Sequence, residues 1–89
     1  MPNDSWFVYI LRCSDNTLYT GVARDPQKRL QQHNHGNKGA KYTRARRPVE
    51  LVYQESAKDR SAAQQREYRI RQLSAAQKRE LISRAAHPS

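Results

Sequence analysis

Residues 6–36, WFVYILRCSDNTLYTGVARDPQKRLQQHNHG, are typical of a β-hairpin that leads directly into a helix. Residues 6–11 are an apolar run rich in aromatic and β-branched side chains, and residues 17–22 are a second β-prone run. The short polar segment between the two runs, Ser14–Asn16, is expected to form the hairpin loop.

The length of this loop decides whether Tyr9 and Tyr19 share a face of the sheet. A two-residue turn would put them on opposite faces, because a one-residue change of register moves alternate side chains to the other side. A three-residue loop places Tyr9 opposite Gly21, which leaves room for the ring, and brings both tyrosines diagonally onto one face. We predict the three-residue loop, because such loops usually end in a left-handed residue and Asn16 tolerates that conformation.

The helix that follows has clear boundary signals. Asp25 can accept hydrogen bonds from the first free amides, Pro26 suits the first helical position, and Gly36 suits a left-handed stop. Arg29 and His33 are four residues apart, so they are expected on one polar, basic face of this helix.

The rest of the chain predicts one more strand and two helices. Residues 49–55 alternate, with Val49, Leu51 and Tyr53 on one face. Residues 58–73 are expected to be helical with Asp59 or Ser61 as cap, and a last helix should run from the cap Ser74 to about residue 85. The expected order is therefore β-β-α-β-α-α, an α+β fold in a single domain over residues 1–89, with its core at about 6–85.

Composition restricts the class of protein. Eighty-nine residues allow one small domain, and 17 Lys and Arg against 8 Asp and Glu give a formal charge of +9, which favours a polyanionic partner. The alternative is a basic surface that only keeps the protein soluble. The single Cys13 is typical of a reducing compartment. No apolar stretch reaches the length of a membrane span, and residues 1–5 lack the pattern of a signal peptide. We therefore expect a cytoplasmic protein without a membrane partner.

A basic segment, residues 37–48 (NKGAKYTRARRP), contains no acidic residue. Such a segment suits a phosphate backbone, and its aromatic residue can stack on a base or sugar. The alternative is a solvated loop that its tyrosine anchors to the core. We interpret the segment as a nucleic-acid contact made by Lys38, Lys41, Tyr42, Arg44, Arg46 and Arg47.

Taken together, these features resemble the GIY-YIG endonuclease superfamily, and most closely its small stand-alone bacterial members. Phe7-Val8-Tyr9 corresponds to the first motif, Tyr19-Thr20-Gly21 to the second, and residues 28–34 (KRLQQHN) to the helix that follows. Glu67 is placed like the metal-binding glutamate of the superfamily. Phe-Val in place of Gly-Ile and Thr in place of Ile depart from the motifs, but neither change removes a tyrosine. The resemblance implies a three-stranded, mainly antiparallel sheet flanked by helices.

The residues that carry the resemblance suit phosphodiester hydrolysis, which needs a positioned water, a base and positive charge beside the phosphate. The catalytic candidates are Tyr9, Tyr19, Arg29, His33 and Glu67. One glutamate with no second acid nearby favours a single hard divalent ion, Mg²⁺ or else Mn²⁺, bound by Glu67, and Arg29 supplies a guanidinium for the scissile phosphate.

The roles of the tyrosines stay open at this point. A tyrosine with the ordinary pKa of about 10 needs nearby cations to act as a base. The resemblance implies that Tyr9 or Tyr19 orients or deprotonates the water while the other positions the phosphate. His33 would relay a proton or protonate the leaving oxygen. A zinc site of His33, His35 and Cys13 is disfavoured, because histidines two apart on a helix point in different directions.

The first hypothesis is therefore a metal-dependent endonuclease that acts on DNA in preference to RNA, selects branched, nicked or single-stranded structures, and serves repair or recombination. A nucleic-acid-binding module that has kept the fold but cleaves slowly or not at all is the alternative. A basic scaffold for protein or membrane surfaces is the third, and the last helices lack the large apolar face that an interfacial membrane helix needs.

Overall fold

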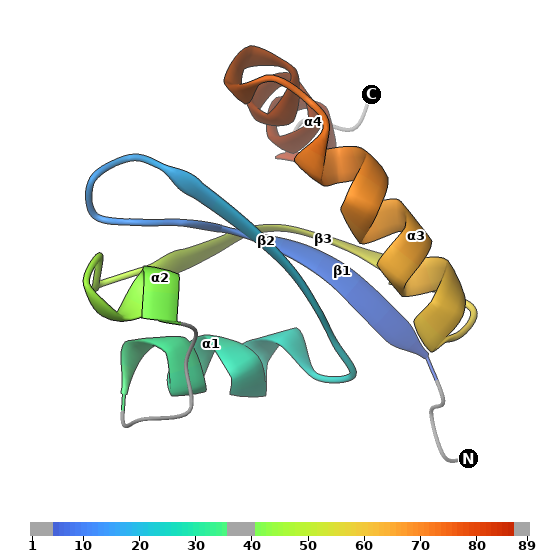
Figure 1. The fold of residues 1–89 in the computed structure, drawn as a ribbon, viewed down its shortest axis with the longest axis horizontal. Helices are drawn as coiled ribbons and strands as arrows, with labels where there is room; N and C mark the ends of the chain where they lie inside the picture. Colours follow the sequence, from blue (N-terminus) through green and yellow to red (C-terminus); the bar gives the residue numbers. More distant parts are fainter. Residues whose placement is uncertain (1–4, 36–40, 87–89) are drawn as a thin grey trace.

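A three-stranded antiparallel sheet forms the centre of the molecule. The computed structural model describes residues 5–35 and 41–86. In it, β1 (Trp6–Arg12) lies between β2 (Leu18–Ala23) and β3 (Glu50–Ala57), so the strand order is β2-β1-β3 and β2 forms one edge (Figure 1). This confirms the α+β class and the antiparallel sheet.

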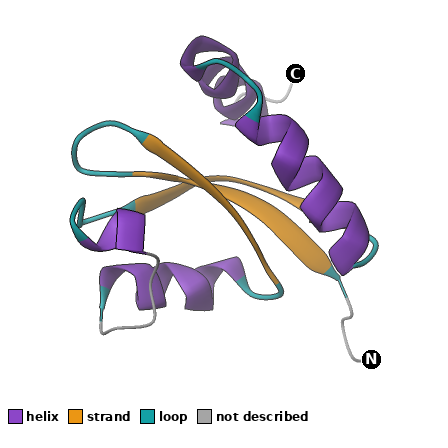
Figure 2. Cartoon of the chain, viewed as in Figure 1, coloured by secondary structure: helices purple, strands orange, loops and turns teal. Residues whose placement is uncertain are grey.

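The described residues form four helices around the sheet, namely α1 (Pro26–Asn34), α2 (Lys41–Arg44), α3 (Arg60–Arg71) and α4 (Ala75–Ala86) (Figure 2). Polar side chains cap three of them: Asp25 accepts from the amide of Lys28, Asp59 from that of Ala62, and the Ser74 hydroxyl from that of Gln77. None of the helices in the described ranges has the length and apolar character that crossing a bilayer requires.

The hairpin has the predicted register. Tyr9 lies opposite Gly21 and Leu11 opposite Tyr19. Asn16 has a φ of 69°, the left-handed conformation that closes a three-residue loop. Asp15 stabilises the loop by accepting from the backbone amide and the hydroxyl of Thr17. Both tyrosines therefore project from the same face of the sheet.

The two faces of the sheet carry separate apolar clusters. Val8 and Ile10 pack with Ala63 and Ile70 of α3 on one face. On the other face Tyr9, Leu11, Cys13 and Val49 form a second cluster, against which Leu30 of α1 packs. The sheet thus separates α1 from α3, as Figure 1 also shows.

Two expectations about these elements were wrong. The basic segment contains a short helix, α2, which makes the order β-β-α-α-β-α-α. A register shift between Ile10 and Leu11 pairs Ile10 with Tyr53 but Leu11 with Leu51. Tyr53 therefore joins the face of α3, not the face of Leu51.

The end of α1 is described as far as its cap. The helix ends at Asn34 with an extended His35 as cap. The predicted stop at Gly36 lies outside the described residues.

Candidate active site

Tyr9 lies at the centre of the site, and its position depends on the absence of a side chain at position 21. The tyrosine is only 1% exposed, although its hydroxyl is polar. A Cβ on Gly21 would lie 2.6 Å from the Tyr9 hydroxyl oxygen and 2.7 Å from Cζ, closer than real atoms approach. The Tyr9 ring therefore lies directly over the backbone of β2, the edge strand.

His33 connects Tyr9 to α2. It is fully buried, its Nε2 is 3.0 Å from the Tyr9 hydroxyl oxygen, and its Nδ1 is 2.7 Å from Oγ1 of Thr43, which is also fully buried. Burial first, and then the charges of Arg29 and Arg47, lower the pKa of His33 to about 4. The imidazole is therefore neutral at pH 7, so one ring nitrogen donates to its partner and the other accepts.

The partners of His33 bear on the two roles predicted for it. Both ring nitrogens have buried protein partners, Tyr9 and Thr43, and a pKa of about 4 leaves almost no imidazolium at neutral pH. This arrangement favours a proton relay through Tyr9 over direct protonation of a leaving oxygen. The contact with His33 also orients the Tyr9 hydroxyl.

Tyr19 is more accessible than Tyr9. It is half-buried, and its ring meets that of His33 edge-on with centroids 5.3 Å apart. On its other side the Tyr42 ring stacks at 6.0 Å with an angle of 25° between the planes. Arg46 covers the Tyr42 ring at 3.9 Å and donates from Nε to Asp15 at 3.0 Å, which ties this stack to the hairpin loop.

Four of the candidates share one electrostatic environment. Burial raises the pKa of Tyr9 to about 12, with further increases from Tyr19 and Glu67, while the Arg29 guanidinium lowers it by its charge and by hydrogen bonding. The charges of Arg29 and Glu67 thus both act on the Tyr9 hydroxyl, although the two residues belong to α1 and α3. The structure places Tyr9 and Tyr19 against the ring of His33, with Arg29 in hydrogen-bonding reach of Tyr9, whereas Glu67 acts on Tyr9 only through its charge.

Glu67 reaches this region from the far face of the sheet. It follows Ala63 by four residues and precedes Ile70 by three, so it shares the helix face of these two buried residues. Its own side chain is half-buried. The α3 helix packs against β1 and the edge strand β2, and the Glu67 charge raises the pKa of the Tyr9 hydroxyl.

The donor set suits a hard cation that keeps most of its water. Within residues 5–35 and 41–86, no three His, Cys, Asp or Glu side chains gather as a metal cluster. Mg²⁺ is commonly bound by one or two carboxylates together with waters and substrate phosphates. A lone, half-buried glutamate beside an arginine fits that mode and does not fit a zinc site, which needs three or four protein ligands.

The basic segment has two kinds of side chain. Arg46 and Arg47 make internal contacts, since Arg46 binds Asp15 and Arg47 donates to the carbonyl oxygen of His33 at 2.5 Å. Lys41 and Arg44 are exposed, and Tyr42 is 38% exposed. Lys38 lies outside the described residues. The segment therefore has an anchoring tyrosine, Tyr42, as the solvated-loop interpretation expects, and also the exposed basic side chains that a nucleic-acid contact needs.

Thr43 is the residue of this site that sequence reasoning missed. It is buried against His33, and α2 holds it there. The only signal in the sequence was a threonine next to the tyrosine that was expected to anchor the segment, and nothing in that pattern identifies a partner ten residues away.

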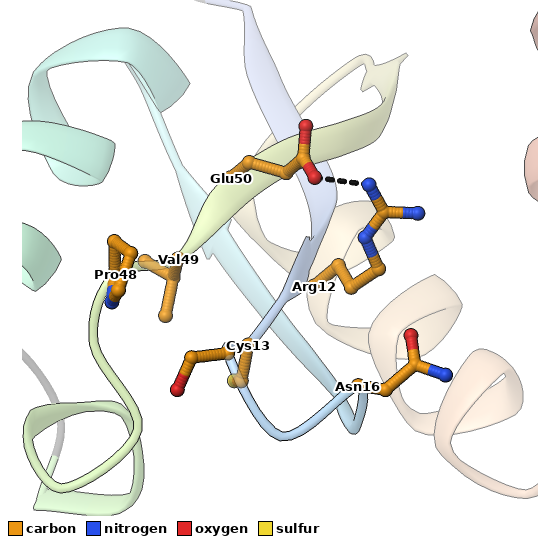
Figure 3. A pocket seen from close by; sticks show the side chains of 7 residues that line it. Arg12, Cys13, Asn16, Pro48, Val49 and Glu50 are labelled. Atoms are coloured by element: carbon orange, nitrogen blue, oxygen red, sulfur yellow. Dashed lines mark hydrogen bonds and ion pairs between the residues drawn. The ribbon is translucent and has the colours of Figure 1, made fainter.

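A hollow of about 320 Å³ lies away from these residues, at the base of the hairpin loop (Figure 3). Cys13, Pro48 and Val49 line its floor, and the exposed ion pair of Arg12 with Glu50 borders it. Burial raises the pKa of the Cys13 thiol, and this cysteine packs in the cluster of Tyr9, Leu11 and Val49.

Comparisons with known proteins show which family and which fold this chain resembles. The model of the GIY-YIG catalytic domain matches residues 5–80. A UPF0213 protein of Desulfotalea psychrophila is 55% identical over 78 residues, which are 88% of this chain and 71% of that protein. A UPF0213 protein of Staphylococcus aureus is 53% identical over 79 residues, 89% of this chain and 95% of its own. The solution NMR structure of a UPF0213 protein from Bacillus halodurans is similar with a TM-score of 0.59 and 39% identity, and the match covers 94% of this chain and 88% of that one.

Proposed function

Because the chain belongs to the GIY-YIG catalytic domain family, whose fold is that of a nuclease, we propose that it is a metal-dependent endonuclease that hydrolyses phosphodiester bonds in DNA. It selects DNA by structure, such as a branch, nick or single-stranded segment, and acts in repair or recombination. The small domain matched over residues 5–80 itself offers little surface for reading sequence, which supports selection by structure.

The observation that carries this proposal is the environment of the Tyr9 hydroxyl. His33 lies within hydrogen-bonding distance, and the charges of Arg29 and Glu67 act on the same oxygen from elements on opposite faces of the sheet. A tyrosine that only packs in the core does not require charged groups of both signs near its hydroxyl. A site for phosphate and a divalent cation requires a cationic side chain for the phosphate and an anionic one for the cation.

The difference in burial supports different roles for the two tyrosines. Tyr9 is buried and has a pKa of about 12, so its hydroxyl stays protonated and acts as a positioned hydrogen-bonding group. Tyr19 is the half-buried member, so its side chain is the one that contacts the attacking water. To act as the base, Tyr19 first releases its own proton to solvent, and its phenolate oxygen then accepts the proton of the water. His33 keeps Tyr9 in place as a neutral partner.

Arg29 and Glu67 are proposed to bind the charged ligands of the reaction, the phosphate and the metal ion. The guanidinium of Arg29 binds the oxygens of the scissile phosphate, for which its planar donors are suited. Glu67 would hold the divalent cation. A bound cation would supply positive charge that stabilises the negative charge developing on the phosphate.

The test is cleavage of a labelled panel of duplex, nicked, branched and single-stranded DNA and the corresponding RNA, with Mg²⁺, with Mn²⁺ and with EDTA. The wild type is compared with Glu67→Gln and with Glu80→Gln. The latter is a matched control, because Glu80 is an exposed residue of α4 that pairs with Arg84.

The proposal expects cleavage of at least one structured DNA that requires the metal, is lost in Glu67→Gln and is retained in Glu80→Gln. If all three proteins bind the panel equally and none cuts it, the chain is a nucleic-acid-binding module instead. Preferential cutting of RNA would keep the nuclease and overturn the choice of DNA.

A further inference from the structure

We propose that the outer face of α3 is a second nucleic-acid site, on which Tyr68 stacks against an unpaired base next to the cleaved phosphate. This inference rests on the proposed function only in that the ligand is a polynucleotide. It names a substrate class for the enzyme, namely strands with unpaired nucleotides close to the cut.

Tyr68 is unusual in its exposure. It is 66% exposed, compared with 38% for Tyr42, the other exposed large hydrophobic residue of the described ranges. It borders a shallow surface hollow of about 580 Å³ together with Ser61, Gln64, Gln65 and Arg69. Figure 1 shows α3 along the sheet with its outer side toward solvent. A rigid helix thus presents an aromatic ring that the fold itself does not use for packing.

The charge of this face suits a phosphate backbone. Glu67 is the only acidic residue of α3, and it lies toward the sheet. Exposed Arg69 and Arg71 flank the outer face, and the amides of Gln64 and Gln65 can donate to or accept from base edges. An aromatic platform bordered by arginines is the combination that binds single strands with little preference for sequence.

The helix geometry puts this face next to the metal-binding candidate. Arg66 turns toward β3, because it binds Glu55 there at 3.0 Å. Successive residues lie about 100° apart around the helix axis. Glu67 is therefore about 100° from Arg66, and Tyr68 is about 200° from it, on the side away from β3.

The distance between Glu67 and Tyr68 is short enough for one strand to reach both. A helix with its side chains is about 10–12 Å across. Successive nucleotides of a duplex strand advance about 3.4 Å along the helix axis. A strand whose phosphate lies at Glu67 therefore reaches Tyr68 within about two or three nucleotides.

Stacking on Tyr68 needs a base that is free of its own neighbours. A base inside an intact duplex presents no open face, whereas a base in a gap, flap or single-stranded segment does. Tyr68 would therefore favour strands that are unpaired two or three nucleotides from the cut, and the preference would be largely independent of base identity.

The test measures binding by fluorescence anisotropy in EDTA, where no metal supports cleavage. The ligands are a labelled single-stranded DNA and a series in which one base at a time is replaced by an abasic site. The proteins are wild type, Tyr68→Phe, Tyr68→Leu and Tyr68→Ala. Phenylalanine keeps the flat ring, and leucine keeps apolar bulk without it. Since the side chain is 66% exposed, all four proteins should fold, which thermal unfolding checks.

We expect Tyr68→Phe to bind like wild type, and Tyr68→Leu and Tyr68→Ala to bind about tenfold more weakly. An abasic site at one position should weaken DNA binding by wild type and Tyr68→Phe by about the same factor of ten, and it should barely change binding by Tyr68→Leu and Tyr68→Ala. The inference is overturned if all proteins respond alike to every abasic position, or if none binds.

The outcome separates this inference from the proposed function. If an abasic site weakens binding only when Tyr68 or phenylalanine is present, and the wild type never cleaves, the Tyr68 surface is supported and the proposed nuclease activity is refuted. Metal-dependent cleavage that is equal in wild type and Tyr68→Leu would refute this surface and retain the nuclease.

Discussion

Gly21 determines where the Tyr9 hydroxyl can lie. The nearest atoms to an added Cβ are the Tyr9 oxygen and Cζ, at 2.6 and 2.7 Å, and Tyr9 is held by His33 and by the surrounding core. In Gly21→Ala the ring must therefore move out of the site. We expect a loss of about 1–3 kcal/mol in the free energy of unfolding, together with a large loss of cleavage. Urea unfolding and cleavage assays check this, and a variant with wild-type stability and rate would contradict the described packing.

His33 makes stability depend on pH. Its pKa falls from 6.5 in the unfolded chain to about 4 in the folded protein. Between these values the unfolded chain binds a proton that the folded protein does not, so stability rises with pH through this range and is lost as pH falls toward 4. The full effect is roughly 3 kcal/mol at about 1.4 kcal/mol per pKa unit.

Urea unfolding between pH 5 and 7 measures this dependence. We expect His33→Gln to flatten the slope in that range, whatever its absolute stability. His35→Gln removes an exposed histidine two residues away and should keep the wild-type slope. Equal slopes in all three proteins would mean that His33 titrates in the folded protein as it does in the unfolded chain.

For the single residues of the site, rules about neighbouring residues in the sequence predicted the register of the hairpin but not the burial of His33. Loop length and the left-handed tolerance of Asn16 are local properties, so they correctly predicted the register of Tyr9 and Tyr19. The burial of His33 is a tertiary property. A histidine on a polar helix gives no local sign that a threonine from another element will cover it.

Among the elements, α3 carries Glu67, and an ion pair fixes it to the sheet. Arg66 donates to both carboxylate oxygens of Glu55, which also accepts from the Tyr53 hydroxyl. The pair is partly shielded, with side-chain exposures of 40% and 28%. Glu55→Gln should therefore lower the free energy of unfolding by about 1–2 kcal/mol, because the guanidinium loses its charged partner.

Glu50→Gln is the matched comparison for this prediction. It makes the same change on the same strand, but Glu50 and its partner Arg12 have side-chain exposures of 59% and 49%. An exposed pair contributes less than about 1 kcal/mol. Thermal or urea unfolding measures both variants. A larger loss in Glu50→Gln than in Glu55→Gln would contradict the assignment of Glu55 as the residue that holds α3.

Elements with their own caps and periodicity were predictable, and the others were not. The α1, α3 and α4 helices have polar caps that the sequence displays. The α2 helix is one turn, too short to be stable by propensity, and its contacts through Tyr42 and Thr43 hold it. The irregularity in β3 has no local signal, because its alternation looks regular in the sequence.

For the molecule as a whole, the formal charge of +9 predicts salt-sensitive binding. The contacts proposed for Arg29, Lys41, Arg44, Arg69 and Arg71 amount to about five phosphates. The logarithm of the duplex binding constant should then fall with the logarithm of salt concentration with a slope of about −4.5. Lys41→Gln should reduce the slope by about 1. Binding that does not change with salt would exclude phosphate contacts as its source.

The most direct test of the catalytic assignment is the single-turnover cleavage rate of Tyr19→Phe at saturating protein with Mg²⁺. The change removes one hydroxyl, the group whose phenolate form is proposed to accept the proton of the attacking water. Tyr53→Phe removes the same group from a tyrosine on the opposite face, and it should cleave at the wild-type rate below its unfolding temperature. We predict that Tyr19→Phe binds DNA like wild type but cleaves at least about 100-fold more slowly. A wild-type rate in Tyr19→Phe would contradict the account.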